Sequence, residues 1–157
     1  MNIYTLGYSG WKIDDIRATM DRLDAVLVDV RMVPRSRVPQ WSCYSLSREF
    51  GHRYAWVREL GNENYKGTFE QIQIANFPAG EKRLRELLAL SNVEGLALSP
   101  AEGASGSKAI ILLCGCKDVT QCHRKLLAER LAEAWSADVV HLTPPAKQES
   151  PGQARLC

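Results

Sequence analysis

Three cysteines, a histidine and an arginine lie within eleven positions of this 157-residue chain, from Cys114 to Arg124. Residues of these types can bind a metal through thiolate and imidazole, attack an electrophile through a thiolate, or bind an anion through cations at the start of a helix. They follow the strongest strand-like segment, 109–114, and lead into a segment with helical spacing, 121–135. The cluster is therefore expected in a loop between a strand and a helix.

Metal binding would use Cys114, Cys116, Cys122 and His123, which form a local set of soft ligands. Structural zinc sites more often combine two ligands from one short knuckle with two from a distant knuckle. Cys122 and His123 are adjacent at the expected start of a helix, where their side chains would point in different directions. No metal and no other cofactor is therefore predicted.

A reactive thiol is the second possibility, with Cys122 as the candidate nucleophile and His123 as its neighbouring acid or base. A cysteine close to a helix N-terminus and to cations has a lowered pKa. Cys114 ends an apolar run and is expected to pack in the core, whereas Cys116 lies in the loop and fits either role.

Asp29 is a further candidate for catalysis. It follows the buried run AVLV and shares a strand face with Arg31. A general base at a ligand pocket and a structural Asp–Arg pair both fit this position, and the structural pair is the commoner arrangement.

Anion binding is the favoured use of this region. His123 and Arg124 lie in the first turn of the expected helix, where positive side chains are unfavourable unless an anion binds. Pairing of Arg124 with Asp118 or Glu129 is the alternative. The predicted ligands of the anion or substrate come from three loops that each follow a strand: Gly7, Tyr8, Ser9, Arg31, Arg35, Arg37 and Arg124.

The segment 31–58 carries six arginines and one acidic residue, with five aromatic residues among them. Arginine with interleaved aromatic residues suits phosphate pairing and base stacking, so the expected partner is a phosphate-bearing small molecule or a nucleic acid. A second interpretation fits equally well, with the aromatic residues in the core and the arginines in solvent.

Strand-like and helix-like segments alternate along the chain. The expected strands are 2–7, 25–30, 53–57, 109–114 and 138–142, and the expected helices are 12–23, 45–50, 68–76, 80–91 and 121–135. This alternation predicts an α/β fold, a three-layer Rossmann-like domain with a mostly parallel sheet of about five strands and helices on both faces. Ligands of such sheets bind outside the carboxyl ends of the strands, where the three loops above emerge.

The chain length indicates one domain, residues 1–142, followed by a polar, Pro-rich tail, residues 143–157, that is expected to be disordered. Residues 100–107 read as a flexible insertion. The five cysteines are an odd number, which fits reduced thiols better than disulfides. The chain begins without a signal-peptide pattern and contains no apolar run of about 20 residues, so a cytoplasmic protein without membrane contact is expected.

Four ordered segments resemble the DUF488 family (domain of unknown function 488): YTLGYSG, LVDVRMVPRSR, RYAWVRELGN and ILLCGCKDVTQCHRKLLAERL. Family members typically show Y-T-I-G-H-S, D-V-R-x-x-P-x-S-R, E-L-G-G and L-L-C-x-E-x-D-x-x-x-C-H-R, and the resemblance runs from about residue 3 to 142. Carried over position by position, it points to Gly7, Ser9, Asp29, Arg31, Pro34, Ser36, Arg37, Glu59, Leu60, Gly61, Cys114, Asp118, Cys122, His123 and Arg124.

The chain departs from this pattern at three positions. Tyr8 replaces the usual histidine of the first loop, Asn62 replaces the second glycine of E-L-G-G, and Cys116 stands where the family often has an acid. If that histidine or acid is catalytic in relatives, the activity of this chain is altered or lost.

A weaker resemblance links the D-V-R strand and the cysteine-bearing loop to rhodanese-type sulfurtransferases and related phosphatases. Here the loop from Cys116 to Arg124 is longer than their tight anion loop and lacks its glycines. The favoured function is an enzyme with an anion-binding pocket that acts on a nucleotide, a nucleic acid or another phosphorylated substrate. The alternatives are a sulfurtransferase or phosphatase that uses a cysteine thiolate, and a non-catalytic nucleic-acid-binding module.

Overall fold

A parallel sheet of five strands forms the centre of the computed structural model, which describes residues 2–94 and 109–146. The strands lie in the order β3-β2-β4-β1-β5, and every neighbouring pair is parallel. Their bounds are β1 (Asn2–Gly7), β2 (Ala25–Asp29), β3 (Tyr54–Trp56), β4 (Ala109–Cys114) and β5 (Asp138–Leu142). Every residue of β2 and β4 is buried, which explains why these two strands are almost continuously apolar.

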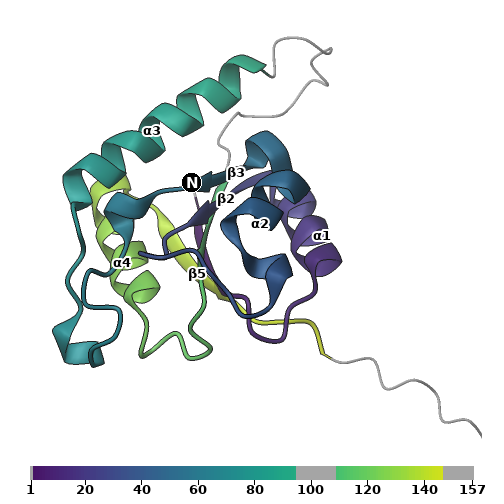
Figure 1. The fold of residues 1–157 in the computed structure, drawn as a ribbon. Coiled ribbons are helices and arrows are strands. Elements are labelled where there is room, and N and C mark those ends of the chain that lie inside the picture. Colours follow the sequence, from purple (N-terminus) through teal and green to yellow (C-terminus); the bar gives the residue numbers. More distant parts are fainter. Residues whose placement is uncertain (1, 95–108, 147–157) are drawn as a thin grey trace, which may run out of the picture.

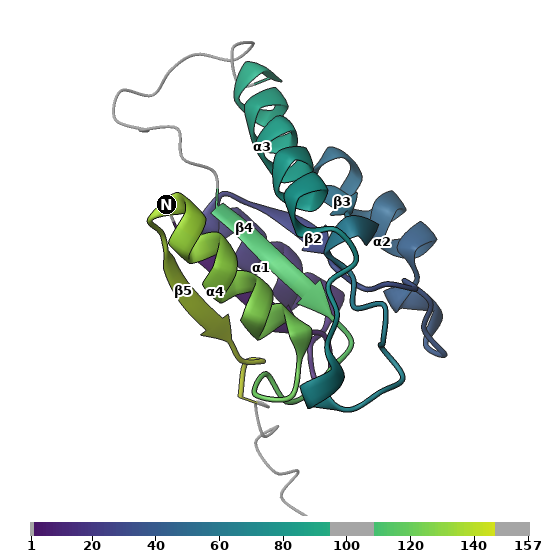
Figure 2. The ribbon, with the colours of Figure 1, turned by 90° about the vertical axis from the view of Figure 1, so that its left-hand side faces the viewer.

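Four helices cover the sheet, two on each face, as Figures 1 and 2 show. They are α1 (Ile13–Leu23), α2 (Cys43–Phe50), α3 (Phe77–Glu94) and α4 (His123–Trp135). Ile16 of α1 and Leu46 of α2 pack with Leu27 and Ile111 on one face. On the other face the sheet packs against α3 and α4, in a core made up of Val28, Ile110, Leu112, Leu84, Leu127 and Leu131. The predicted three-layer α/β fold is confirmed.

The expected helix over residues 68–76 is wrong. Only one 3-10 turn, η4 (Phe69–Gln71), forms there, and Thr68 and Gln71 cap each other. After this turn the chain lies beside Asn62, whose side-chain oxygen accepts hydrogen bonds from the backbone N–H groups of Asn64 and Gln73. The bond from Gln73, with that from the amide of Ala75 to the carbonyl of Gly61, takes the place of a helical ladder. Helix α3 begins at Phe77, three residues before the expected start.

Helix α4 begins at His123, two residues later than expected. Cys122 is its N-cap residue and has an extended backbone, with φ −129° and ψ 137°. This conformation determines where the side chains of the cysteine cluster point, because it turns Cys122 back toward the end of β4.

Because all strands are parallel, their carboxyl ends meet at one edge of the sheet. Tyr8 N–H donates to the carbonyl of Cys114 (3.2 Å), and Val30 N–H donates to that of Leu113 (3.1 Å). These bonds join the loops after β1 and β2 to the end of β4, so the predicted convergence of three loops occurs.

Three short 3-10 turns complete the order of elements: η1 (Pro39–Trp41), η2 (Gly51–Arg53) and η3 (Arg58–Leu60). The expected insertion, 100–107, lies outside the described residues, as does most of the expected disordered tail; residues 143–146 are exposed and irregular. Among the described helices, none is long and apolar enough to cross a membrane.

Candidate functional site

A cavity of about 460 Å³ opens at the carboxyl edge of the sheet. Its wall combines two arginines, three aromatic rings, three uncharged polar side chains and a group of thiols with an imidazole. The arginines are Arg31 and Arg35, and the aromatic residues are Tyr8, Tyr65 and Phe69. The uncharged polar residues are Asn62, Thr68 and Gln121, and the thiols and the imidazole belong to Cys114, Cys116 and His123. None of the described residues that line the cavity is acidic.

The cysteine cluster forms one side of this cavity. The Sγ atoms of Cys114, Cys116 and Cys122 all lie within 4.8 Å of one another, and those of Cys114 and Cys116 are 3.6 Å apart. His123 Nδ1 lies 3.9 Å from the sulfurs of both Cys114 and Cys122. The expectation that Cys122 and His123 would point in different directions is therefore wrong, because the extended N-cap residue turns both side chains toward Cys114.

The hydrogen bonds within the cluster favour negative charge on Cys114. Those from Cys116 and Cys122 hold the pKa of Cys114 well below its ordinary value, against the effect of burial. The same contact with Cys114 raises the pKa of Cys116 to about 11 and also raises the pKa of Cys122. Burial alone would lower the pKa of His123, but its contact with Cys114 raises it overall. The lowered thiol pKa thus belongs to Cys114, not to the expected Cys122.

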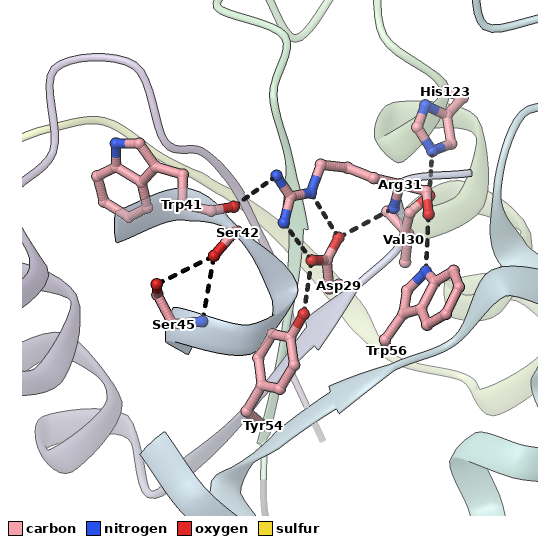
Figure 3. Close-up of polar contacts among 9 residues, drawn as sticks. All are labelled: Asp29, Val30, Arg31, Trp41, Ser42, Ser45, Tyr54, Trp56 and His123. Atoms are coloured by element: carbon pink, nitrogen blue, oxygen red, sulfur yellow. Dashed lines mark hydrogen bonds and ion pairs between the residues drawn. The ribbon is translucent and has the colours of Figure 1, made fainter. Parts of the chain in front are cut away.

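Asp29 and Arg31 form a buried ion pair where the chain leaves β2 (Figure 3). Arg31 donates from Nε and Nη2 to the two carboxylate oxygens at 2.8 and 2.5 Å, and from Nη1 to the carbonyl of Trp41. The Tyr54 hydroxyl donates to the same carboxylate at 2.7 Å. Burial would lower the pKa of Arg31, but Asp29 more than offsets this and raises it. Asp29 is fully buried and does not line the cavity.

Arg124 is also buried, at 3% exposure, and lies behind the loop that carries Cys116. Its guanidinium donates to the carbonyls of Cys116 (2.7 Å) and Lys117 (3.5 Å). The loop passes so close to β1 that a Cβ atom on Gly7 would lie 2.1 Å from the Cys116 carbonyl oxygen. Gly7 and Arg124 therefore position this loop and do not face the cavity.

The N-terminus of α4 is less open to an anion than the sequence indicates. The amide of Cys122 donates to the carbonyl of Val119, and that of Lys125 to the carbonyl of Cys122. The alternative pairing of Arg124 is not found among the described ion pairs: Asp118 accepts hydrogen bonds from Thr120, and Glu129 pairs with Lys125.

The predicted site residues thus fall into three groups. Tyr8, Arg31, Arg35 and His123 line the cavity. Buried positions outside its wall are occupied by Gly7, Asp29, Cys122 and Arg124. Ser9 and Arg37 are exposed and outside it.

The wall residues of the segment 62–72 were missed by sequence reasoning: Asn62, Tyr65, Gly67, Thr68, Phe69 and Ile72. Part of that segment reads as a helix, which would have turned its polar side chains to solvent. The sequence does indicate a loop in GNENYKGT, residues 61–68, because its glycines and asparagines are typical of turns.

The family model described as Domain of unknown function DUF488 matches residues 15–131, well over half of the chain. The chain belongs to the DUF488 family. The matched region begins within α1 and ends within α4, so it contains the Asp29–Arg31 pair, the segment 62–72 and the whole cysteine cluster. No curated protein and no solved structure matches the chain. The family description names no activity, and the function has to be argued from the site.

Proposed function

We propose that this DUF488 protein is an enzyme that acts on a small phosphorylated molecule with a planar group, such as a nucleotide, bound in the cavity at the carboxyl edge. The observation that carries the proposal is the composition of the wall. It combines an exposed arginine, aromatic rings and thiol–imidazole groups, without an acidic side chain among the described residues.

The phosphate is assigned to the side of the cavity that carries Arg35. Arg31 also lines the wall, but its charge is balanced by Asp29 at 2.5 Å. Arg35 is exposed and makes no ion pair among those of the described residues, so its guanidinium is available to a ligand. A guanidinium suits phosphate because its N–H groups can donate to two oxygens at once.

The planar group is assigned to the aromatic side. The ring of Tyr8 is held in place by stacking on Trp41, with ring centres 4.9 Å apart and an interplanar angle of 9°. The guanidinium of Arg31 lies over the Tyr8 ring at 5.4 Å. Tyr65 and Phe69 line the cavity too, and aromatic side chains of this kind stack on bases. A volume of about 460 Å³ lies in the range of small-molecule sites.

The favoured class is an enzyme because the thiol and imidazole groups of Cys114, Cys116 and His123 belong to the same wall. Side chains of these types supply nucleophiles, acids and bases, or metal ligands. A pure nucleic-acid-binding module has less support, since Trp41 and Phe50 of the arginine-rich segment are core residues and Tyr54 bonds to Asp29.

Thermal unfolding with a panel of ligands tests the binding half of the proposal. Nucleoside monophosphates should raise the melting temperature more than the matching nucleosides or inorganic phosphate at equal concentration. Gln121→Trp, which places a large ring in the cavity wall, should reduce this shift. Lys117→Trp is the matched control, because Lys117 is exposed on the same loop and does not line the cavity.

Phosphorus NMR of the bound monophosphates tests the enzymatic half. Conversion of many molecules per chain is expected for at least one compound that stabilises the protein. Stabilisation without any conversion would contradict the enzyme and favour a binding module. A panel without any stabilising ligand, or equal shifts in both tryptophan variants, would contradict the ligand site.

A further inference from the structure

We infer that Cys114, Cys116, Cys122 and His123 hold a zinc ion at the wall of the cavity, as a closed Cys3His site. The inference rests on the distances between the four side chains, on the hydrogen bond that orients the imidazole, and on the charge of a buried arginine next to the cluster. It bears on the function proposed above, because a zinc ion held by all four side chains leaves none of them free as a nucleophile, acid or base.

Three separations within the cluster are close to those around a tetrahedral zinc ion. Zinc–sulfur bonds of about 2.3 Å place two sulfurs of one tetrahedron about 3.8 Å apart, and a sulfur and a nitrogen about 3.6 Å apart. The sulfurs of Cys114 and Cys116 are 3.6 Å apart, and Nδ1 of His123 is 3.9 Å from those of Cys114 and Cys122. The sulfur of Cys116 lies within 4.8 Å of the other two sulfurs, whereas His123 falls outside this group, so the exposed loop of Cys116 has to move toward the imidazole to complete the set.

The imidazole of His123 is oriented as in metal sites, by a hydrogen bond from the ring nitrogen that would not bind the metal. Nε2 lies 2.8 Å from the carbonyl oxygen of Val30, which can only accept, so Nε2 carries the proton (Figure 3). Nδ1, the other ring nitrogen, then faces two sulfurs. Ligating histidines in proteins are oriented by such a hydrogen bond from the non-ligating nitrogen to a carbonyl or carboxylate.

The local backbone explains how adjacent residues contribute two ligands. Cys122 is the extended N-cap residue of α4, whereas His123 has helical geometry. The change of conformation between them turns both side chains toward Cys114 at the end of β4. A continuous helix through both residues would have separated them by about 100° around its axis.

Arg124 provides independent support through its charge. Its side chain is 3% exposed, and none of the ion pairs between described residues compensates its charge. A buried cation is strongly unfavourable unless a negative charge lies close by, and thiolates of the adjacent cluster supply one. Zinc with three thiolates and a neutral imidazole carries one net negative charge, and Arg124 holds the carbonyl of the ligand Cys116 at 2.7 Å.

Zinc is the metal that these ligands favour. Thiolates and imidazole are soft or borderline donors, and a tetrahedral set of sulfur and nitrogen atoms is typical of structural zinc. Such an ion would fasten the loop 115–121 to the ends of β4 and α4. It would thereby fix the position of the cavity wall that carries Gln121 and Cys116.

Metal uptake by the untagged protein tests the inference. The protein is stripped with a chelator and then titrated with zinc in competition with a chromophoric chelator. We expect one zinc ion per chain for the wild type and for Cys43→Ser, a free cysteine outside the cluster. Cys116→Ser should bind zinc at least about 100-fold more weakly, because the loss of a partner that only orients a ligand already costs 10- to 100-fold.

Cys116 is exposed, so its serine variant should fold, and the melting temperature of the stripped protein should equal that of the wild type. Cobalt in place of zinc should give the near-ultraviolet charge-transfer band of thiolate ligands and the intense visible bands of a tetrahedral site. The inference is overturned if the wild type takes up far less than one zinc ion per chain. Equal affinity in Cys116→Ser, or the weak spectrum of six-coordinate cobalt, would overturn it as well.

Discussion

His123 donates a hydrogen bond from Nε2 to the carbonyl oxygen of Val30 at 2.8 Å, although 93 positions separate the two residues. The bond joins the first residue of α4 to the residue that follows β2. The bond directs Nδ1 of His123 toward the cysteines. Arg31, which follows Val30 in the chain, pairs instead with Asp29. One short segment of chain thus supports both the thiol side of the cavity and the arginine–aspartate side.

Asp29→Asn should lower the free energy of unfolding by about 3–5 kcal/mol, the cost of breaking a buried ion pair and leaving one charge uncompensated. Asp21→Asn is the control, since Asp21 pairs with Arg53 at a half-exposed position, where such pairs contribute less than about 1 kcal/mol. Urea unfolding of both variants measures the difference. Equal losses in the two variants would show that Asp29 does not stabilise the fold through this pair.

Gly7→Ala should displace the loop that carries Cys116. The added methyl would lie 2.1 Å from the Cys116 carbonyl oxygen, so the loop has to move outward, at a cost of about 1–3 kcal/mol for a forced contact. The alkylation rate of Cys116 in metal-free protein, followed by mass spectrometry of the modified peptide, should rise.

Gly51→Ala separates this effect from a general loss of stability. Gly51 has φ +54° and open space around it, so the variant is strained without a contact to the loop. It should lose stability while the alkylation rate of Cys116 stays at the wild-type value. The same rate in Gly7→Ala as in Gly51→Ala would contradict the close approach of the loop to β1.

Glu81→Gln should destabilise the protein at neutral pH by less than about 1 kcal/mol, the scale of partly exposed charged contacts. Hydrogen bonds from Trp135 and Arg85, both at 2.8 Å, lower the pKa of Glu81 below its ordinary value of 4.5. A lowered pKa in the folded state stabilises the protein above the unfolded pKa, and this contribution disappears as the pH falls through the folded pKa.

The difference in stability between wild type and Glu81→Gln should therefore be largest near neutral pH and should shrink below about pH 4.5. Thermal unfolding at a series of pH values gives this difference. Glu86→Gln, which removes only a 3.9 Å contact with Lys82, is the control and should change stability little at neutral pH. A difference for Glu81→Gln that grows on acidification would have the wrong sign for this account.

The sheet was predictable because its central strands are buried on both faces. AVLV before Asp29 and the apolar run 109–114 leave little alternative to buried strands, and the spacing of Ile16 and Met20 indicates α1. The segment 68–76 was misassigned because its backbone hydrogen bonds go to an earlier segment: the amide of Gln73 donates to the side chain of Asn62, and that of Ala75 donates to the carbonyl of Gly61. Such a tertiary contact leaves no trace in local periodicity.

The place of the site was predictable, whereas the orientation of its side chains was not. Parallel strands oblige the three loops to meet, and the spacing of Asp29 and Arg31 indicates their ion pair, but the sequence does not reveal that Arg124 is bound by two carbonyls. Nor does it reveal that a single extended residue, Cys122, brings three thiols and an imidazole together. These outcomes depend on backbone angles and on contacts between distant residues.

The most direct test of the ligand site compares two arginines of the same exposed loop. Arg35 lines the cavity and Arg37 does not. The dissociation constant of the nucleoside monophosphate that stabilises the wild type most should rise about 10- to 100-fold in Arg35→Ala, as expected for lost hydrogen bonds to a charged group. It should stay at the wild-type value in Arg37→Ala. Titration calorimetry at constant salt gives all three constants, and equal weakening in both variants, or none in Arg35→Ala, would contradict the cavity as the binding site.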